Sequence, residues 1–346
     1  MVERLVDRRP EVSRPQLVAS LAPPPLFGSV SFASYRPDPR EPTQAAALDS
    51  LRSFAARISA PAARRRRLRR TGDGGRDPVR GDYLDGGFGV GKTHLLAALW
   101  HAVPGPKAYA TFVEVTHLAG ALGFAGVVEA LGAMRLVAID QFELDDPGDT
   151  VLVSTLLARL AERGVALAAT SNTLPEALGD GRFASADFRR EIQGLAARFT
   201  SVRVDGPDYR HRGRPPAPIP LTDAELLRTI AELDGRGGAT VSLDDFGELA
   251  TFLMTQHPSR YGALVDGVDV VGLREVRPAA DEAAALRLVV LADRLYDRQL
   301  PVLASGVPLP EVFTPAMLAG GYRKKYLRAT SRLVALARMA REELGR

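Results

Sequence analysis

The feature that most constrains the fold of this chain is a glycine-rich segment of eight residues, GGFGVGKT, at positions 86–93. It matches the pattern G-x-x-x-x-G-K-[ST] and lies between a predicted strand in GDYLDGG and a predicted helix in THLLAALWHAV. Glycines in such a segment let backbone N–H groups turn inward around phosphate oxygens, and the start of the helix adds its dipole to the same anion. The sequence therefore predicts a phosphate-binding loop, or P-loop.

The residues of this loop indicate its ligands. Lys92 is expected to place its charge on the β and γ phosphates of a nucleotide, and the Thr93 hydroxyl is expected to ligate Mg²⁺. His94 is expected to pack or to face the nucleotide rather than to bind a metal. We therefore expect ATP and Mg²⁺ as ligands. The predicted nucleotide-binding residues are Gly86, Gly87, Phe88, Gly89, Val90, Gly91, Lys92, Thr93 and His94.

Apolar strands alternate with helices from residue 81 to residue 206. Further strands are predicted at the start of AYATFVEVTHLAGAL and in MRLVAID, VALAATSN and TSVRVDG, with helices between them. This alternation indicates a parallel sheet that is covered by helices on both faces. The predicted fold class is α/β, a P-loop NTPase of the AAA+ type, with a further α/β region at the C-terminal end.

The strand in RLVAID ends at Asp140, whose carboxylate is expected to hold Mg²⁺ through water. It lies 48 residues after Lys92 (140 minus 92), which suits an intervening strand and two helices. The next residue is normally a glutamate that activates water in P-loop ATPases, but here it is Gln141. An amide can orient water but cannot accept its proton. The simplest expectation is tight nucleotide binding with slow turnover.

Two alternatives for Gln141 stay open. A nearby carboxylate could act in its place, and the candidates are Glu143, Asp145, Asp146 and Asp149. Alternatively, phosphoryl transfer depends mainly on positioning and electrostatics, so that Gln141 costs only part of the rate, as for the glutamine that positions water in some GTPases.

The segment after the next strand supplies the remaining catalytic candidates. Asn172, at the tip of ATSN, is expected to hold the attacking water or the γ phosphate, or else to cap the turn that follows. Arg182, on a glycine-flanked turn, is the first candidate for an arginine that crosses a subunit boundary to the γ phosphate, and Arg190 is the second. Each could instead form a surface salt bridge.

Composition divides the chain into four parts: a proline-rich arm at 1–42, the P-loop core at 43–206, a linker at 207–220 and the C-terminal region at 221–346. In the last part, Thr222 and Glu225 have capping-box spacing, and Ser242 is predicted to cap a helix in DDFGELATFLM. RGVALAATSNTLPEAL also resembles RQLPVLASGVPLPEVF, and each follows a predicted strand and helix. If this similarity is not chance, the C-terminal region contains a strand–helix–strand unit without a P-loop.

Charge and composition bear on partners and location. The chain has no cysteine, which excludes disulfides and thiolate metal sites, and no signal-peptide pattern or long uninterrupted apolar run, so a cytoplasmic protein is the expectation. The formal charge is +4, and six arginines lie between Arg64 and Arg70. This run is either a solvated surface loop or a contact for nucleic acid, membrane or a partner.

Several motifs beyond the P-loop resemble the ZapE family of cell-division ATPases and their mitochondrial AFG-type relatives, over about residues 32–332. They are YRPDP with TQAAAL, YLDGGFGVGKTHLL, IDQFELDD, ATSNTLPEAL, VDGPDYRHR, LADRLYDRQLPVLAS and ATSRLVAL. LYDR and TSRL are the specific ones. Gln141 departs from the family's glutamate, and Arg332 of TSRL matches a family position.

The resemblance implies ATP- and Mg²⁺-dependent activity and an oligomeric, ring-like form that acts on protein partners. Bacterial members are associated with the division ring, and mitochondrial members with turnover or chaperoning of membrane-complex subunits. Two other interpretations remain. GVGKTHLL also occurs in replication initiators and helicase loaders, so the chain could act on nucleic acid through its arginine run. Gln141 also fits a scaffold protein, in which bound ATP assembles a ring and is scarcely hydrolysed.

Overall fold

The computed structural model describes residues 2–11, 13–60, 81–87, 89–144, 147–175, 178, 188–207 and 217–344. The chain forms two compact units, a P-loop unit of Arg14–Arg214 and a C-terminal unit of Pro215–Arg346 together with Met1–Ser13. The predicted arm at 1–42 is therefore divided between the two units. The reason is that its first residues pair with a strand of the C-terminal unit.

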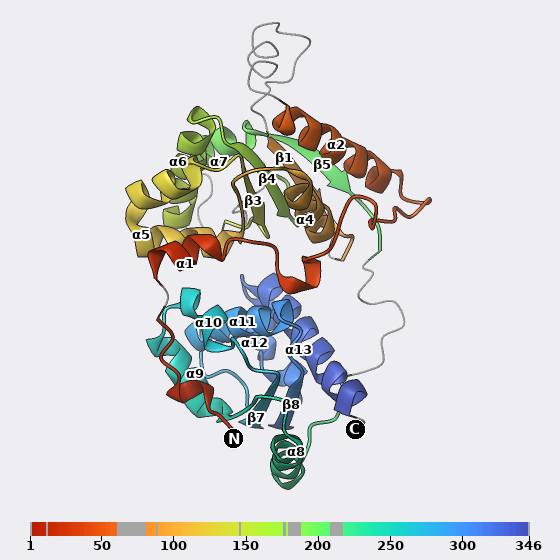
Figure 1. The fold of residues 1–346 in the computed structure, drawn as a ribbon, viewed down its shortest axis with the longest axis vertical. Helices are drawn as coiled ribbons and strands as arrows, with labels where there is room; N and C mark the ends of the chain where they lie inside the picture. Colours follow the sequence, from red (N-terminus) through yellow and green to blue (C-terminus); the bar gives the residue numbers. More distant parts are fainter. Residues whose placement is uncertain are drawn as a thin grey trace, which may run out of the picture. The chain divides into compact units, whose positions relative to one another are not determined.

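The P-loop unit is built on a five-stranded parallel sheet with the order β2-β3-β4-β1-β5 (Figure 1). This bears out the predicted parallel α/β sheet. The strands are β1 (Gly81–Gly86), β2 (Lys107–Thr111), β3 (Leu136–Asp140), β4 (Ala166–Ser171) and β5 (Phe199–Val204).

Helices cover both faces of this sheet because its central strands are apolar on both sides. Tyr83 belongs to one core cluster with residues of α5 and α6, whereas the adjacent Leu84 belongs to another with residues of α2 and α4. Parallel sheets buried on both faces read as continuous apolar runs. The helices are α1 (Arg14–Ala19), α2 (Pro42–Ser59), α4 (Lys92–Ala102), α5 (Phe112–Gly132), α6 (Pro147–Glu162) and α7 (Arg189–Ala196), with a 3₁₀ turn η2 (Pro25–Phe27).

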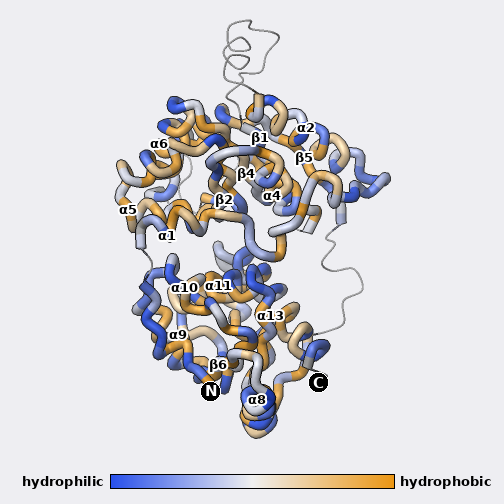
Figure 2. The backbone as a smooth tube through the Cα atoms, viewed as in Figure 1, coloured by the Kyte–Doolittle hydropathy of each residue, from blue (hydrophilic) through white to orange (hydrophobic). Residues whose placement is uncertain are grey.

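By length and composition, α5 could cross a membrane, and Figure 2 draws most of it in hydrophobic colours. Its backbone is broken at Gly123, which has φ 75° and ψ 159°. Its buried residues belong to the sheet's core, and α5 packs against α6 and β2. Packing on the sheet therefore accounts for the buried third of this apolar helix segment.

The C-terminal unit has its own three-stranded parallel sheet in the order β6-β7-β8. The strands are β6 (Val241–Asp245), β7 (Val270–Val276) and β8 (Val302–Gly306). Around them lie α8 (Asp223–Arg236), α9 (Phe246–Thr255), α10 (Tyr261–Leu264), α11 (Glu282–Asp297), α12 (Pro315–Ala319) and α13 (Arg323–Leu344), with 3₁₀ turns η1 (Leu5–Asp7), η6 (Pro258–Arg260) and η7 (Leu309–Glu311). The strand–helix–strand β7–α11–β8 parallels β3–α6–β4, as the internal similarity indicated.

One predicted helix cap is correct and one is wrong. Thr222 and Glu225 form the predicted capping box at the start of α8. Ser242 does not cap α9, because it lies buried within β6. The cap is Asp245, whose Oδ1 accepts from the backbone N–H groups of Gly247 (2.9 Å) and Glu248 (3.0 Å). The helix cap therefore lies three residues later than the sequence pattern suggested, because Val241–Asp245 form a strand that was not predicted.

A buried charge cluster joins α11 to α13. Asp293 pairs with Arg328 at 3.1 Å and also with Arg332, whose guanidinium lies 5.2 Å from the Tyr296 ring. Burial alone would raise the pKa of Asp293, but Arg328, Arg332 and Arg294 outweigh it and hold the pKa below its ordinary value. The LYDR and TSRL motifs therefore meet in this cluster.

Candidate nucleotide-binding site

Two glycines of the P-loop have backbone conformations that other residues rarely adopt. Gly86 ends β1 with φ 156°, and a Cβ atom there would lie 2.0 Å from the carbonyl oxygen of Val204 on β5. Gly91 precedes α4 with φ 92°, and a Cβ atom there would lie 2.6 Å from a ring carbon of Tyr35. The close approach of neighbouring chain segments thus explains why glycine stands at both ends of the loop.

Lys92 begins α4, and its ammonium lies among oxygens of the loop and of β4. Nζ donates to the carbonyl oxygens of Gly86 (2.9 Å) and Gly87, and to Oδ1 of Asn172 at 2.9 Å. The Lys92 side chain is therefore held over the loop, where a phosphate would bind. The structure brings Asn172 to the same place.

Asp140, at the end of β3, accepts hydrogen bonds from three groups. The Thr93 hydroxyl lies 3.2 Å from both of its carboxylate oxygens. The Thr170 hydroxyl and the backbone N–H of Gln141 (3.1 Å) both donate to Oδ1. These bonds orient the carboxylate toward the first turn of α4.

The strand order explains how these residues meet. Asp140 lies beside the P-loop at Thr93, although its strand is not next to the P-loop strand, because β4 lies between β3 and β1. The intervening elements α4, β2 and α5 are those that the 48-residue spacing predicted. Because β4 is central, Thr170 near its end and Asn172 directly after it both lie at the site.

The backbone at Gln141 turns sharply away from the strand. Gln141 has a left-handed φ of 56°, its N–H also lies 3.0 Å from the Thr170 hydroxyl, and the next N–H, of Phe142, donates to the Thr170 carbonyl (2.7 Å). Phe142 is fully buried against Phe112, with ring centroids 5.1 Å apart. The turn therefore fixes Gln141 at the carboxyl-terminal end of β3, where the residue is half-buried.

The alternative carboxylates lie at different places. Glu143 is only 3% exposed, and because β3 ends before Gln141, the two residues do not share a strand face. Asp149 lies in the first turn of α6. Asp145 and Asp146 lie outside the described residues.

The N-terminal segment of the P-loop unit packs against the loop, which the sequence did not reveal. The Tyr35 hydroxyl donates to the carbonyl of Val90 (3.2 Å), and its ring meets His94 edge-on at 5.5 Å. His94 Nε2 lies 3.0 Å from the Ser34 hydroxyl and 3.3 Å from the carbonyl oxygen of Ser31. Burial lowers the pKa of His94, while its bond to Ser31 opposes this shift. His94 therefore packs against the protein, which was one of the two placements expected for it.

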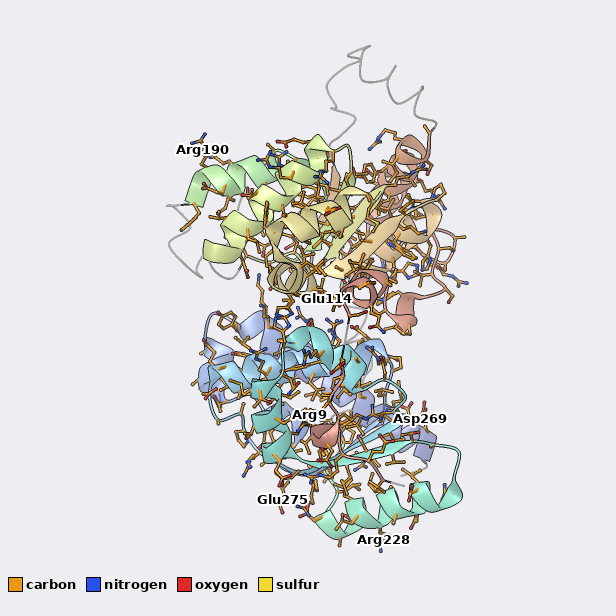
Figure 3. All side chains as sticks on the ribbon, turned by 60° about the vertical axis from the view of Figure 1, so that its left-hand side comes forward. Arg9, Glu114, Arg190, Arg228, Asp269 and Glu275 are labelled. Atoms are coloured by element: carbon orange, nitrogen blue, oxygen red, sulfur yellow. The ribbon has the colours of Figure 1, made fainter. Side chains whose placement is uncertain are left out.

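The structure describes only one of the two arginine candidates. Arg190 lies on α7 with an exposed side chain that points away from the unit (Figure 3). Arg182 lies outside the described residues, as do Phe88 and the arginine run. The catalytic role of Arg190 and of Arg182 therefore stays a prediction.

The donor set of the site fits Mg²⁺. Thr93 and Asp140 bring hard oxygen atoms together at the start of α4, and Mg²⁺ commonly takes one or two such protein ligands together with phosphate oxygens and water. In the described part of the chain, no group of three or more His, Asp or Glu side chains could hold a metal by itself.

The P-loop unit has a five-stranded parallel sheet, with the P-loop lysine after β1 and a carboxylate suited to Mg²⁺ at the end of β3, two strands from β1. This combination defines an AAA+-type P-loop NTPase. A family model described as AFG1-like ATPase matches residues 11–234 and 229–343. The chain therefore belongs to the AFG1-like ATPase family, whose members are ATPases.

Comparison with individual proteins gives distant similarities. The cell division protein ZapE of Escherichia coli K12 is 28% identical over 276 residues, which cover 68% of this chain and 73% of that protein. Among solved structures, AMPPCP-bound DnaA from Aquifex aeolicus has a TM-score of 0.39 and 11% identity, over 91% of this chain and 92% of that one. The DnaC helicase loader has a TM-score of 0.36 and 16% identity, over 52% and 99%.

Proposed function

We propose that this chain binds Mg²⁺–ATP and couples slow hydrolysis to work on a protein partner, as an oligomeric ATPase of the ZapE type. The observation that carries the proposal is the convergence of Lys92, Asn172 and Asp140 at one edge of the sheet. Membership in the AFG1-like ATPase family supports ATP as the nucleotide.

Each side chain has a distinct role in this proposal. Backbone N–H groups of the loop and Lys92 bind the β and γ phosphates, and Asn172 is placed beside them. Thr93 and Asp140 would hold Mg²⁺, which supplies neutralising charge to the phosphates when bound. The Thr170 hydroxyl keeps Asp140 oriented. Gln141 orients the attacking water through its amide.

The proposed slow turnover follows from the chemistry of Gln141. Its amide cannot accept the proton that the attacking water loses, whereas a carboxylate at this position can. The carboxylate of Glu143 lies two residues further on, buried beyond the turn. We therefore infer that ATP binding is retained and that the chemical step is the slow one.

The proposed partners are proteins. The similarity to ZapE supports components of the division machinery, and the mitochondrial branch of the family suggests membrane-protein quality control as the other setting. In a cytoplasmic homo-oligomer, Arg182 or Arg190 of one copy would reach the γ phosphate bound by its neighbour. These assignments rest on the family and on residue chemistry.

Nucleotide titrations test the proposal. Lys92→Ala should abolish ATP binding, and Asp140→Asn should remove the dependence of ATP affinity on Mg²⁺, both measured by isothermal titration calorimetry. Asp49→Asn on an exposed position of α2 is the matched charge control and should bind as the wild type does. ATP binding by Lys92→Ala that equals the wild type would refute the proposed site.

A second candidate function, on nucleic acid, is favoured by the arginine run. Binding through these arginines would weaken with salt, with a slope in log K of about −0.9 per neutralised phosphate of duplex DNA. A variant with the arginines between Arg64 and Arg70 changed to glutamine should lose this binding. If the wild type shows no salt-dependent binding, the loader function is excluded.

A further inference from the structure

The first residues of the chain pair with the edge of the C-terminal sheet. Glu3 and Ser242 form a parallel bridge. The backbone N–H of Glu3 donates to the carbonyl of Val241 (2.9 Å), and the N–H of Leu243 donates to the carbonyl of Glu3 (2.9 Å). Residues 2–9, called the tail below, thus pair through Glu3 with β6, which is the outer strand of this sheet, and then make the 3₁₀ turn η1.

A buried carboxylate of β6 binds the backbone of the tail. The N–H of Leu5 donates to Oδ2 of Asp244 (2.9 Å), and the N–H of Val6 donates to Oδ1 (3.1 Å). Asp244 is 1% exposed, and burial raises its pKa, while the bonds from Leu5 and Val6 oppose the shift. The Leu5 side chain is fully buried in the unit's core. Both oxygens of a buried acid therefore bind the first two N–H groups of the 3₁₀ turn η1.

The second half of the tail is held by arginines. Arg8 donates to the carbonyl oxygens of Leu264 (2.9 Å) and Asp266 (2.8 Å), at the end of α10. Arg9 lies 5.1 Å from the ring of Phe252 on α9, and Figure 3 shows it where the tail passes this helix. The carbonyl oxygens of Leu264 and Asp266 and the ring of Phe252 are features that select a segment carrying arginine.

The tail is joined to this unit only by non-covalent contacts. After Ser13 the chain enters the P-loop unit, and it returns only at Pro215. The opposite edge of the sheet differs, because Leu221, which donates to the carbonyl of Ala304 (2.9 Å), continues directly into α8. Release of the tail would expose Leu5, remove the packing of Val2 and Val6 and the two N–H bonds to Asp244, and leave the pairing of β6, β7 and β8 intact.

We propose that the β6 edge, Asp244 and the carbonyls of Leu264 and Asp266 form a peptide-binding site, and that the tail is its exchangeable ligand in cis. The site takes a segment that pairs with the sheet edge through one residue and then makes a 3₁₀ turn, with a leucine at the buried position and an arginine three residues later, as in Leu5 and Arg8. Main-chain bonds at Glu3, Leu5 and Val6 supply affinity, and the buried position of Leu5 supplies selectivity, by the same division of roles as when a peptide adds to a sheet edge. The docked tail acts as a second, releasable connection between the two units. The proposal does not depend on the proposed ATPase cycle.

The test uses the full-length chain and a fluorescein-labelled peptide of residues 2–11, with binding followed by anisotropy. Leu5→Asp should release the tail in cis and leave the site free, so this variant should bind the peptide. The wild type should bind it at least tenfold more weakly, because its own tail competes at high effective concentration. The matched control is the same peptide with Leu5→Asp, which should bind at least tenfold more weakly, about 1.4 kcal/mol. Adding Asp244→Ala to the variant chain should reduce peptide binding by a similar factor.

Hydrogen exchange of the wild type gives an independent readout. The amides of Leu5 and Val6 should exchange at least tenfold faster than that of Leu273 on β7, because the tail opens locally. Exchange of all three together would show that the tail is an integral part of the fold, and it would overturn the proposal. Failure of Leu5→Asp to fold, or its failure to bind the peptide while folded, would overturn it as well.

Discussion

Thr170 connects the two sides of the candidate site. Its hydroxyl donates to Asp140 and accepts from the N–H of Gln141, so one side chain orients the magnesium-type carboxylate and fixes the turn after it. The sequence predicted Asp140, Gln141 and Asn172 because each ends or follows an apolar strand. Thr170 gave no such signal, because within ATSN it reads as an ordinary strand residue, and only the strand order places it beside Asp140.

Removing this hydroxyl should weaken the site more than the fold. Thr170→Val keeps the shape of the side chain and leaves Gln141 N–H with Asp140 alone, so we expect a loss of about 1–2 kcal/mol in the free energy of unfolding. ATP affinity should become less dependent on Mg²⁺. Urea denaturation and calorimetric titration measure the two effects. Thr251→Val, at an exposed position of α9, is the control and should change stability by no more than about 0.5 kcal/mol. Unchanged stability and Mg²⁺ dependence in Thr170→Val would contradict this role.

Gly91 gives a second prediction at the same scale. Gly91→Ala places a Cβ atom against the Tyr35 ring at a φ of 92°. It should therefore lower the free energy of unfolding by about 1–3 kcal/mol and reduce ATP affinity. Gly120→Ala is the matched control, because this helical glycine has no neighbour within 4 Å of a new Cβ atom. It should stabilise α5 by about 0.5–1 kcal/mol. Thermal denaturation compares the two variants, and equal stability would refute the argument.

Among the elements, the pairing of α11 with α13 shows why short family-specific motifs can be far apart in sequence. Tyr296 of LYDR and Arg332 of TSRL meet over the Asp293 carboxylate, and Arg332 has a structural role there. The sequence could indicate the strands and helices, because apolar runs and caps are local signals. It could not indicate that β4 lies between β1 and β3, or that the tail pairs with β6, because pairing between distant segments leaves no periodic pattern.

The Asp293 cluster predicts a pH dependence of stability. Because its folded pKa lies below the ordinary value of 3.8, ionised Asp293 contributes stability above that pH. This contribution should fall as the pH drops from about 4 toward the lower folded value. Urea denaturation between pH 3 and 6, at roughly half-unit steps, measures it.

Asp293→Asn should remove that part of the pH dependence of stability. It also leaves Arg328 and Arg332 without their shared ionised partner, so the free energy of unfolding near neutral pH should fall by about 3–5 kcal/mol. Asp266→Asn, whose carboxylate is 63% exposed in its pair with Arg298, is the control and should change little. A wild-type slope that persists in Asp293→Asn would assign the pH dependence to other groups.

The whole chain consists of two units with separate cores, and the proposed nucleotide contacts all lie in one of them. ATP should therefore stabilise the P-loop unit selectively, by about 2.7 kcal/mol at a concentration of 100 times Kd. Hydrogen exchange with and without nucleotide should show slower exchange in β1, β3 and β4, with little change in β6, β7 and β8. Equal protection of both sheets would show that the units respond to nucleotide as one body.

We propose that the chain binds ATP and that Gln141 slows its hydrolysis. The most direct test measures ATP affinity and steady-state turnover for the wild type and for Gln141→Glu. We expect similar affinity and at least a tenfold faster turnover in the variant, which corresponds to about 1.4 kcal/mol of activation barrier. Equal turnover in the two proteins would contradict the claim, and would mean that another group supplies the base or that none is needed.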